Sequence, residues 1–176
     1  MNMFVKGAFV ASVVLAGLSS GVVFADDSGS VHVAGTIVDA SCLIASSQLT
    51  RTVDFGDIDA HDVSGVGVGA VVKTEPLAFD ITDCPASTNQ VGIRFDYTAN
   101  ADGQNYLQNT GDAAGALFGI SSDADDTAVA SGTALYAASI TDGAATVNAK
   151  ANLYHVDDTY TPGSLTSTAN VTLVYN

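Results

Sequence analysis

Acidic residues dominate the charge of this chain. Its 176 residues include 19 Asp and Glu but only 5 Lys and Arg, which gives a formal net charge of −14 at pH 7. Such a surface repels nucleic acids and anionic membranes, so the composition excludes both as partners, and we interpret the acid excess as a source of solubility.

The first 25 residues have the pattern of a secretory signal peptide. Lys6 precedes a strongly apolar run at residues 7–18, and Ala25 stands directly before two aspartates. The alternative, a transmembrane anchor, needs about 20 apolar residues, which is more than this run supplies. The sequence therefore predicts an exported chain whose remaining length, about 150 residues, suits one domain.

The chain has two cysteines, Cys42 and Cys84. An even number of cysteines in an exported protein predicts a disulfide bond. The competing interpretations, a metal-binding pair or a catalytic thiol, call for histidines or further cysteines at ligand spacing, and the sequence supplies none. We expect a structural disulfide.

Most of the remaining chain has the pattern of β-strands. The clearest example is the alternation of Val91, Ile93, Phe95 and Tyr97, which places apolar side chains on one face of a strand. Turn-forming stretches separate such segments, and no long segment after the signal peptide has helical periodicity. This pattern predicts an antiparallel β-sandwich of the immunoglobulin-like class. The expected strands are residues 30–38, 51–55, 76–82, 91–97, 116–120, 145–156 and 169–175.

The sequence offers no catalytic or cofactor-binding constellation. Residues 123–127 resemble the start of a calcium loop, but Ala128 and Ala134 stand where glycine and glutamate are needed. Residues 65–70 are glycine-rich yet lack the Lys-Ser/Thr of a phosphate loop, so we interpret them as a mobile connection. The histidines are far apart in sequence, without partners at ligand spacing: His32, His61 and His155. We expect no enzymatic activity, no metal and no cofactor.

Several motifs together resemble a fimbrial subunit of the chaperone–usher pathway, close to the type 1 pilin group. Gly163 is fourteenth from the C-terminus and Tyr175 is penultimate, as in the β-zipper signature of that family. The other motifs are GTIVDASC at 35–42, VDFG at 53–56, PLAFDITDCP at 76–85, VNAKANLYHV at 147–156 and ANVTLVYN at 169–176.

The resemblance implies an incomplete immunoglobulin-like β-sandwich that lacks its last strand. A hydrophobic groove then lies open beside the C-terminal strand, and a donor strand from another polypeptide completes the fold. A periplasmic chaperone would first lend a strand along Val171, Leu173 and Tyr175 and hold the carboxylate of Asn176. With Gly163, these residues form the expected chaperone and donor groove.

The N-terminal arm of the next subunit would later replace the chaperone. Residues 26–35 fit this role because they are polar at the start and then alternate along one face. The simpler interpretation is a first sheet strand with a disordered leader. The donor face consists of Gly29, Val31, Val33 and Gly35.

We therefore predict a signal peptide at 1–25, a donor-strand arm at 26–35 and a pilin domain at 36–176. The predicted function is that of a structural subunit of a surface fimbria that supports cell adhesion. Its predicted partners are a periplasmic pilus chaperone, an outer-membrane usher and neighbouring pilin subunits in a head-to-tail polymer. The alternative is a self-contained secreted immunoglobulin-like binding module.

Overall fold

The computed structural model describes residue 34 and residues 41–101 and 105–175. The chain separates into two units, Met1–Ile37 and Val38–Asn176, and every strand and helix described here lies in the second. The predicted signal peptide, nearly all of the predicted strand at 30–38, the four donor-face residues and Asn176 lie outside the described residues.

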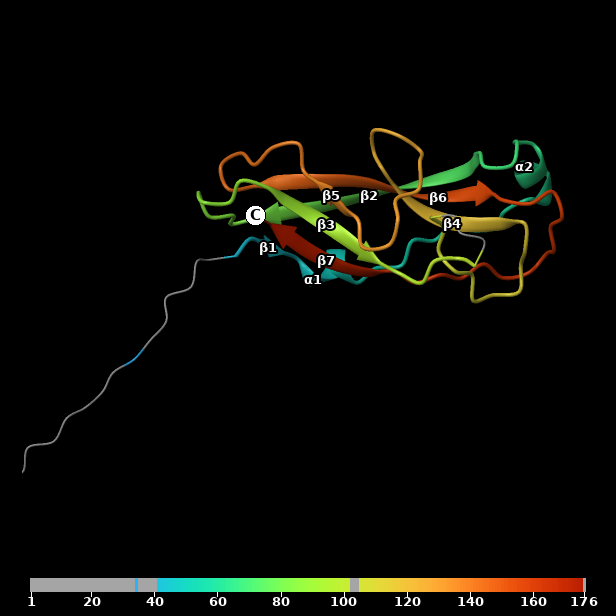
Figure 1. Ribbon diagram of the computed structural model, residues 1–176, viewed down its shortest axis with the longest axis horizontal. Coiled ribbons are helices and arrows are strands. Elements are labelled where there is room, and N and C mark those ends of the chain that lie inside the picture. Colours follow the sequence, from blue (N-terminus) through green and yellow to red (C-terminus); the bar gives the residue numbers. More distant parts are fainter. Residues whose placement is uncertain (1–33, 35–40, 102–104, 176) are drawn as a thin grey trace, which may run out of the picture. The chain divides into compact units, whose positions relative to one another are not determined.

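Antiparallel strands, short and long, are the main regular elements of the second unit (Figure 1). The C-terminal end of β7 and helix α2 lie at opposite ends of this unit (Figure 1). The elements are β1 (Leu43–Ile44), α1 (Ser46–Leu49), α2 (Ala60–Ser64), β2 (Val71–Thr82), β3 (Val91–Asp96), β4 (Ala116–Ser122), β5 (Ala134–Tyr136), β6 (Ala145–His155) and β7 (Asn170–Tyr175).

These strands form two sheets that pack face to face. One has the order β1-β2-β6-β4 and the other the order β5-β3-β7, and all neighbouring strands are antiparallel. Phe79 of β2 meets Phe95 of β3 edge to face, with ring centroids 5.8 Å apart, so side chains of both sheets fill the space between them. This arrangement confirms the predicted antiparallel β-sandwich.

The predicted alternation is visible in the burial of β3 and β6. Val91, Ile93 and Phe95 are buried and point into the core, and so do Val147 and Leu153. A strand turns every second side chain to the same face, which explains why these strands were predictable.

The predicted strand at 51–55 is wrong. These residues form no strand, and the neighbouring edge of β2 is bonded by side chains instead. The Asp80 amide donates to Oε1 of Gln48 at 2.6 Å, and Nη1 of Arg51 donates to the Ala78 carbonyl at 3.2 Å. Where β2 extends past its pairing with β1, side-chain hydrogen bonds thus replace the backbone hydrogen bonds of a neighbouring strand.

The glycine-rich stretch at 65–70 is held in place by His155, which disagrees with a mobile connection. The Gly69 amide donates to the His155 carbonyl at 2.7 Å, and the His155 amide donates to Ala70 at 3.0 Å. The ring nitrogen Nδ1 of His155 also lies 2.8 Å from the Val66 carbonyl. His155 is buried, so its side chain fixes this loop on the end of β6.

Candidate functional site

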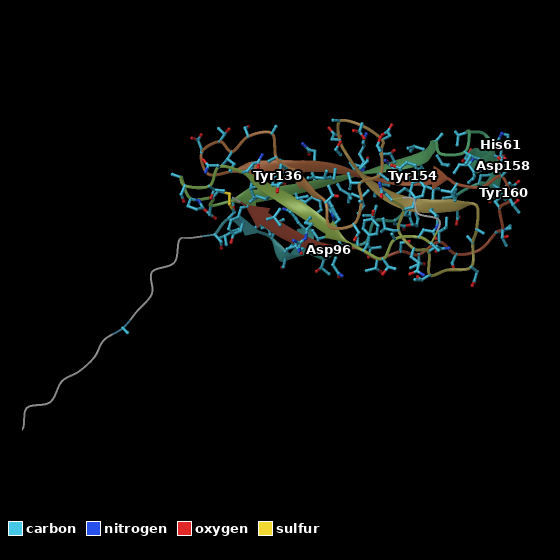
Figure 2. The ribbon with its side chains drawn as sticks, viewed as in Figure 1. His61, Asp96, Tyr136, Tyr154, Asp158 and Tyr160 are labelled. Atoms are coloured by element: carbon cyan, nitrogen blue, oxygen red, sulfur yellow. A yellow bond between two sulfur atoms is a disulfide. The ribbon has the colours of Figure 1, made fainter. Side chains whose placement is uncertain are left out.

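A groove with a volume of about 950 Å³ lies between the two sheets. We call residues 51–58 its first lip, and residues 160–169 with Val171 its second lip. Tyr160 of the second lip lies at the α2 end of the unit, where Figure 2 also labels His61 and Asp158. The floor between the lips is apolar and consists of Leu77, Phe79, Phe95, Leu107, Phe118 and Ile120.

The second lip is hydrogen-bonded along its far side. The Thr110 amide donates to the Thr166 carbonyl at 2.8 Å, and the Ala113 amide donates to the Ser164 carbonyl at 3.1 Å. The Thr166 amide donates to Oδ1 of Asn109 at 2.9 Å. From there the chain continues into β7, which within the described residues pairs with β3 alone. Within the described residues, the backbone from the second lip through β7 is therefore hydrogen-bonded along one side, and its other side faces the groove without a partner strand.

Side chains alternate along this edge. Ala169, Val171 and Leu173 are half-buried and pack against the core, whereas the residues between them are exposed. An unpaired strand edge with an inward-facing apolar row is a template on which another strand can pair. The half-buried, odd-numbered row is Leu165, Ser167, Ala169, Val171 and Leu173.

The structure brings two of the predicted groove residues to the groove itself. Gly163 and Val171 line it, and Leu173 packs against the core in the same row as Val171. A Cβ at Gly163 would lie 2.8 Å from the Ala113 nitrogen, so the lip requires a glycine there. Tyr175 is 49% exposed at the end of β7. The predicted Asn176 lies outside the described residues.

Sequence reasoning missed the first lip and the floor. Arg51 projects its guanidinium over the Phe79 ring, with Cζ 4.5 Å from the ring centroid. Burial lowers the pKa of the Arg51 guanidinium below its ordinary value. The VDFG motif at 53–56 was the one signal for this region, and it gave no indication that the segment faces a groove.

A disulfide bond joins Cys42 to Cys84, with an S–S distance of 2.09 Å. Both cysteines are buried, and they link the residue before β1 to the segment after β2. The Cys84 amide donates to the Gly143 carbonyl at 2.9 Å, which ties the bridge to the turn before β6. The bridge therefore secures the start of the described domain to its longest strand.

The side chains that could bind a metal ion do not cluster in the part of the chain that the structure describes. Those residues contain no group of three or more His, Cys, Asp or Glu that could hold a metal ion. They also contain no helix long and apolar enough to cross a membrane. Nε2 of His155 lies 3.0 Å from the Asp157 carbonyl, so both ring nitrogens face backbone carbonyls and the residue has a structural role.

Comparison with known proteins identifies the family. The family model described as "Fimbrial protein" matches residues 31–176. The Fimbria A protein of Serratia marcescens is 33% identical over 172 residues, which cover 94% of this chain and 95% of that protein. Protein FimG of Escherichia coli (strain K12) is 28% identical over 122 residues, covering 69% of this chain and 68% of FimG.

Solved structures share the fold. A subunit in the structure of a chaperone-usher pilus has a TM-score of 0.64 and 21% identity, covering 88% of this chain and 99% of that chain. The P pilus rod subunit PapA has a TM-score of 0.63 and 19% identity, covering 78% of this chain and 100% of PapA. The sandwich is thus the immunoglobulin-like fold that lacks a strand. The chain belongs to the fimbrial protein family, and it is a fimbrial subunit.

Proposed function

We propose that this fimbrial subunit polymerises head to tail by exchanging strands, so that residues 26–35 of one copy fill the groove of the next. The observation that carries this proposal is the edge of β7 opposite β3, which has no partner strand among the described residues and lies beside an apolar groove of about 950 Å³. Backbone hydrogen bonds to that edge supply affinity, and alternate side chains entering the groove supply specificity. Contacts of this kind do not close on themselves, so they produce a filament.

Before assembly, a periplasmic chaperone occupies the same edge and an outer-membrane usher receives the subunit. An apolar groove of this size invites aggregation if it is left uncovered, which supports the need for a chaperone. Val171, Leu173 and Tyr175 form the strand face that the chaperone pairs with, and the chaperone holds the carboxylate of Asn176. The finished fimbria stands on the cell surface and supports adhesion.

The chain acts as a structural protein without enzymatic activity. Residues 1–25 are the signal peptide, residues 26–35 the arm and residues 36–176 the pilin domain. The names of the relatives support this role, since they are fimbrial and pilus proteins.

Thermal unfolding of the subunit with a synthetic peptide of residues 26–35 tests the proposal. A ligand that binds only the folded state stabilises it, by about 2.7 kcal/mol at about 100 times its Kd. The melting temperature should therefore rise with peptide concentration, whereas a control peptide with aspartate in place of Val31 and Val33 should have no effect. An unchanged melting temperature at saturating peptide, together with a stable peptide-free monomer, would favour the self-contained binding module instead.

A further inference from the structure

Arg51 is the cationic side chain of the first lip. Its guanidinium carbon lies 4.5 Å from the centroid of the Phe79 ring, and Nη1 donates to the Ala78 carbonyl at 3.2 Å. A guanidinium over an aromatic face is attracted by the negative charge of the ring face. The side chain therefore lies on the floor of the groove although its charge favours water.

Arg51 has no carboxylate partner among the described residues, and this distinguishes it from the other cations there. Lys73 pairs with Glu75 at 3.9 Å, Arg94 with Asp96 at 2.9 Å and Lys150 with Asp126 at 2.7 Å. The chain has 19 acidic residues, so a surface arginine has many possible partners. The position of Arg51 is thus fixed by the Phe79 ring and the Ala78 carbonyl, and not by an ion pair with a described residue.

Phe79 lies on the groove floor, where the side chains of an incoming strand would be buried. It is 1% exposed, and its ring and that of Phe95 meet edge to face. Phe95 is in register with Val171 of β7. The guanidinium of Arg51 therefore rests on the floor of the groove at the level of the second lip's apolar row.

We propose that Arg51 is a built-in cover of Phe79, and that an apolar side chain from the arm of a second copy of this chain replaces it when the strand binds. This inference rests on the proposed function and specifies which contact the donor strand must exchange. The occupant is Val31 or Val33 of residues 26–35, because these are the apolar side chains of the donor face.

Charge complementarity favours this occupant. The arm carries Asp26 and Asp27 and no Lys or Arg. When a valine covers Phe79, the guanidinium returns to water beside a strand of opposite charge, so its release costs little. Arg51 also acts as a specificity determinant, since a glycine or serine at the same position of the arm buries too little apolar surface to displace it.

Association kinetics of the fluorescently labelled peptide of residues 26–35 test this inference. The full-length subunit, with its disulfide intact, is refolded and mixed with the peptide. Arg51→Ala should bind about fivefold faster than the unmutated subunit, the factor that corresponds to a cation–π contact of about 1 kcal/mol. Arg51→Lys should bind at an intermediate rate. The control Arg94→Ala removes the same charge from outside the groove and should change the rate less than about twofold.

NMR spectroscopy supplies a second readout that does not depend on folding of the variant. The Nε–Hε signal of Arg51 should shift away from its ring-stacked position when the unmutated subunit binds the peptide. If Arg51→Ala fails to fold, Arg51→Gln keeps a polar but shorter side chain without the guanidinium or its charge and should also bind faster.

The outcomes separate the two proposals. If the unmutated subunit binds no peptide, strand exchange itself is wrong and the cover has no role. If it binds but Arg51→Ala or Arg51→Gln binds no faster, and the Arg51 signal does not move, strand exchange stands and only the cover is wrong.

Discussion

Tyr136 of β5 lies across Gly92 of β3. The two residues face each other in the antiparallel register of the three-stranded sheet. A Cβ at residue 92 would lie 2.7 Å from Cδ1 of Tyr136 and 2.6 Å from the Leu135 carbonyl oxygen. The Tyr136 ring (Figure 2) thus covers a strand residue that has no side chain of its own.

Gly92→Ala should therefore destabilise the sandwich. Overpacking of this kind costs about 1–3 kcal/mol of the free energy of unfolding, which denaturant titration of the peptide-bound subunit measures. Combining Gly92→Ala with Tyr136→Ala removes the clash with the tyrosine ring and should recover part of the lost stability. The recovery should be incomplete, because the clash with the Leu135 carbonyl oxygen remains. Equal stability of Gly92→Ala and the unmutated subunit would contradict the close contact.

Replacing either cysteine with serine should remove about 4 kcal/mol, because the bridge closes a loop with a sequence separation of 42. Chemical denaturation and the yield of exported subunit measure this loss. The double variant Cys42→Ser with Cys84→Ser should be no less stable than either single variant. Normal stability of the single variants would show that the bridge is not structural.

Leu173→Asp should abolish co-purification with the chaperone and leave the subunit degraded or aggregated. A carboxylate in the inward-facing row of β7 costs several kcal/mol when an apolar partner covers it. Thr172→Asp is the matched control, because Thr172 is exposed on the same strand. Pull-down from exported fractions measures both variants, and recovery of Leu173→Asp with the chaperone would refute the assignment of this row.

Val33→Asp should block filament formation while the chaperone complex persists. The charge would have to enter an apolar groove during assembly, whereas the proposed chaperone complex does not involve the subunit's own arm. Ser30→Asp places the same charge on the opposite face of the arm and should still assemble. Electron microscopy distinguishes the two results, and filaments of Val33→Asp would show that the donor face is misassigned.

The stability of the fold should fall in alkaline solution. Burial raises the pKa of Tyr154 above its ordinary value of 10.0, and its hydroxyl donates to the Asp126 carbonyl. A tyrosine whose pKa is higher in the folded state contributes stability that is complete below the unfolded-state pKa and is lost as pH rises through the folded-state pKa. The free energy of unfolding should thus decline above about pH 10. Tyr154→Phe should reduce this slope but not remove it, because the pKa of Tyr97 is also raised by burial.

The sequence predicted the strands in which apolar and other side chains alternate residue by residue. Val91, Ile93 and Phe95 reveal their inner face without knowledge of any partner, because a strand repeats every two residues. The segment at 51–55 has the same local pattern, but whether it pairs depends on the edge of β2, where Gln48 and Arg51 supply side-chain bonds instead. β5 has three residues and was missed because so short a strand carries no periodicity.

The groove was predictable on one side only. Gly163 and Val171 belong to a continuous C-terminal stretch, so their relation is visible in the sequence. The floor combines Phe79 with Phe95 and Ile120 from three different strands, and only the packing of the two sheets brings them together. The position of Arg51 on this floor depends on the same packing and leaves no local pattern.

The disulfide also determines how the subunit transmits a pulling force. In the proposed polymer, tension would reach each subunit through residues 26–35, which precede Cys42 in the sequence. The bond to Cys84 passes this tension directly to the end of β2, so the segment between the two cysteines is not on the shortest covalent path. That segment contains the first lip of the groove. In the proposed polymer, we therefore expect the disulfide to keep the segment that contains this lip out of the covalent path that carries tension from the arm.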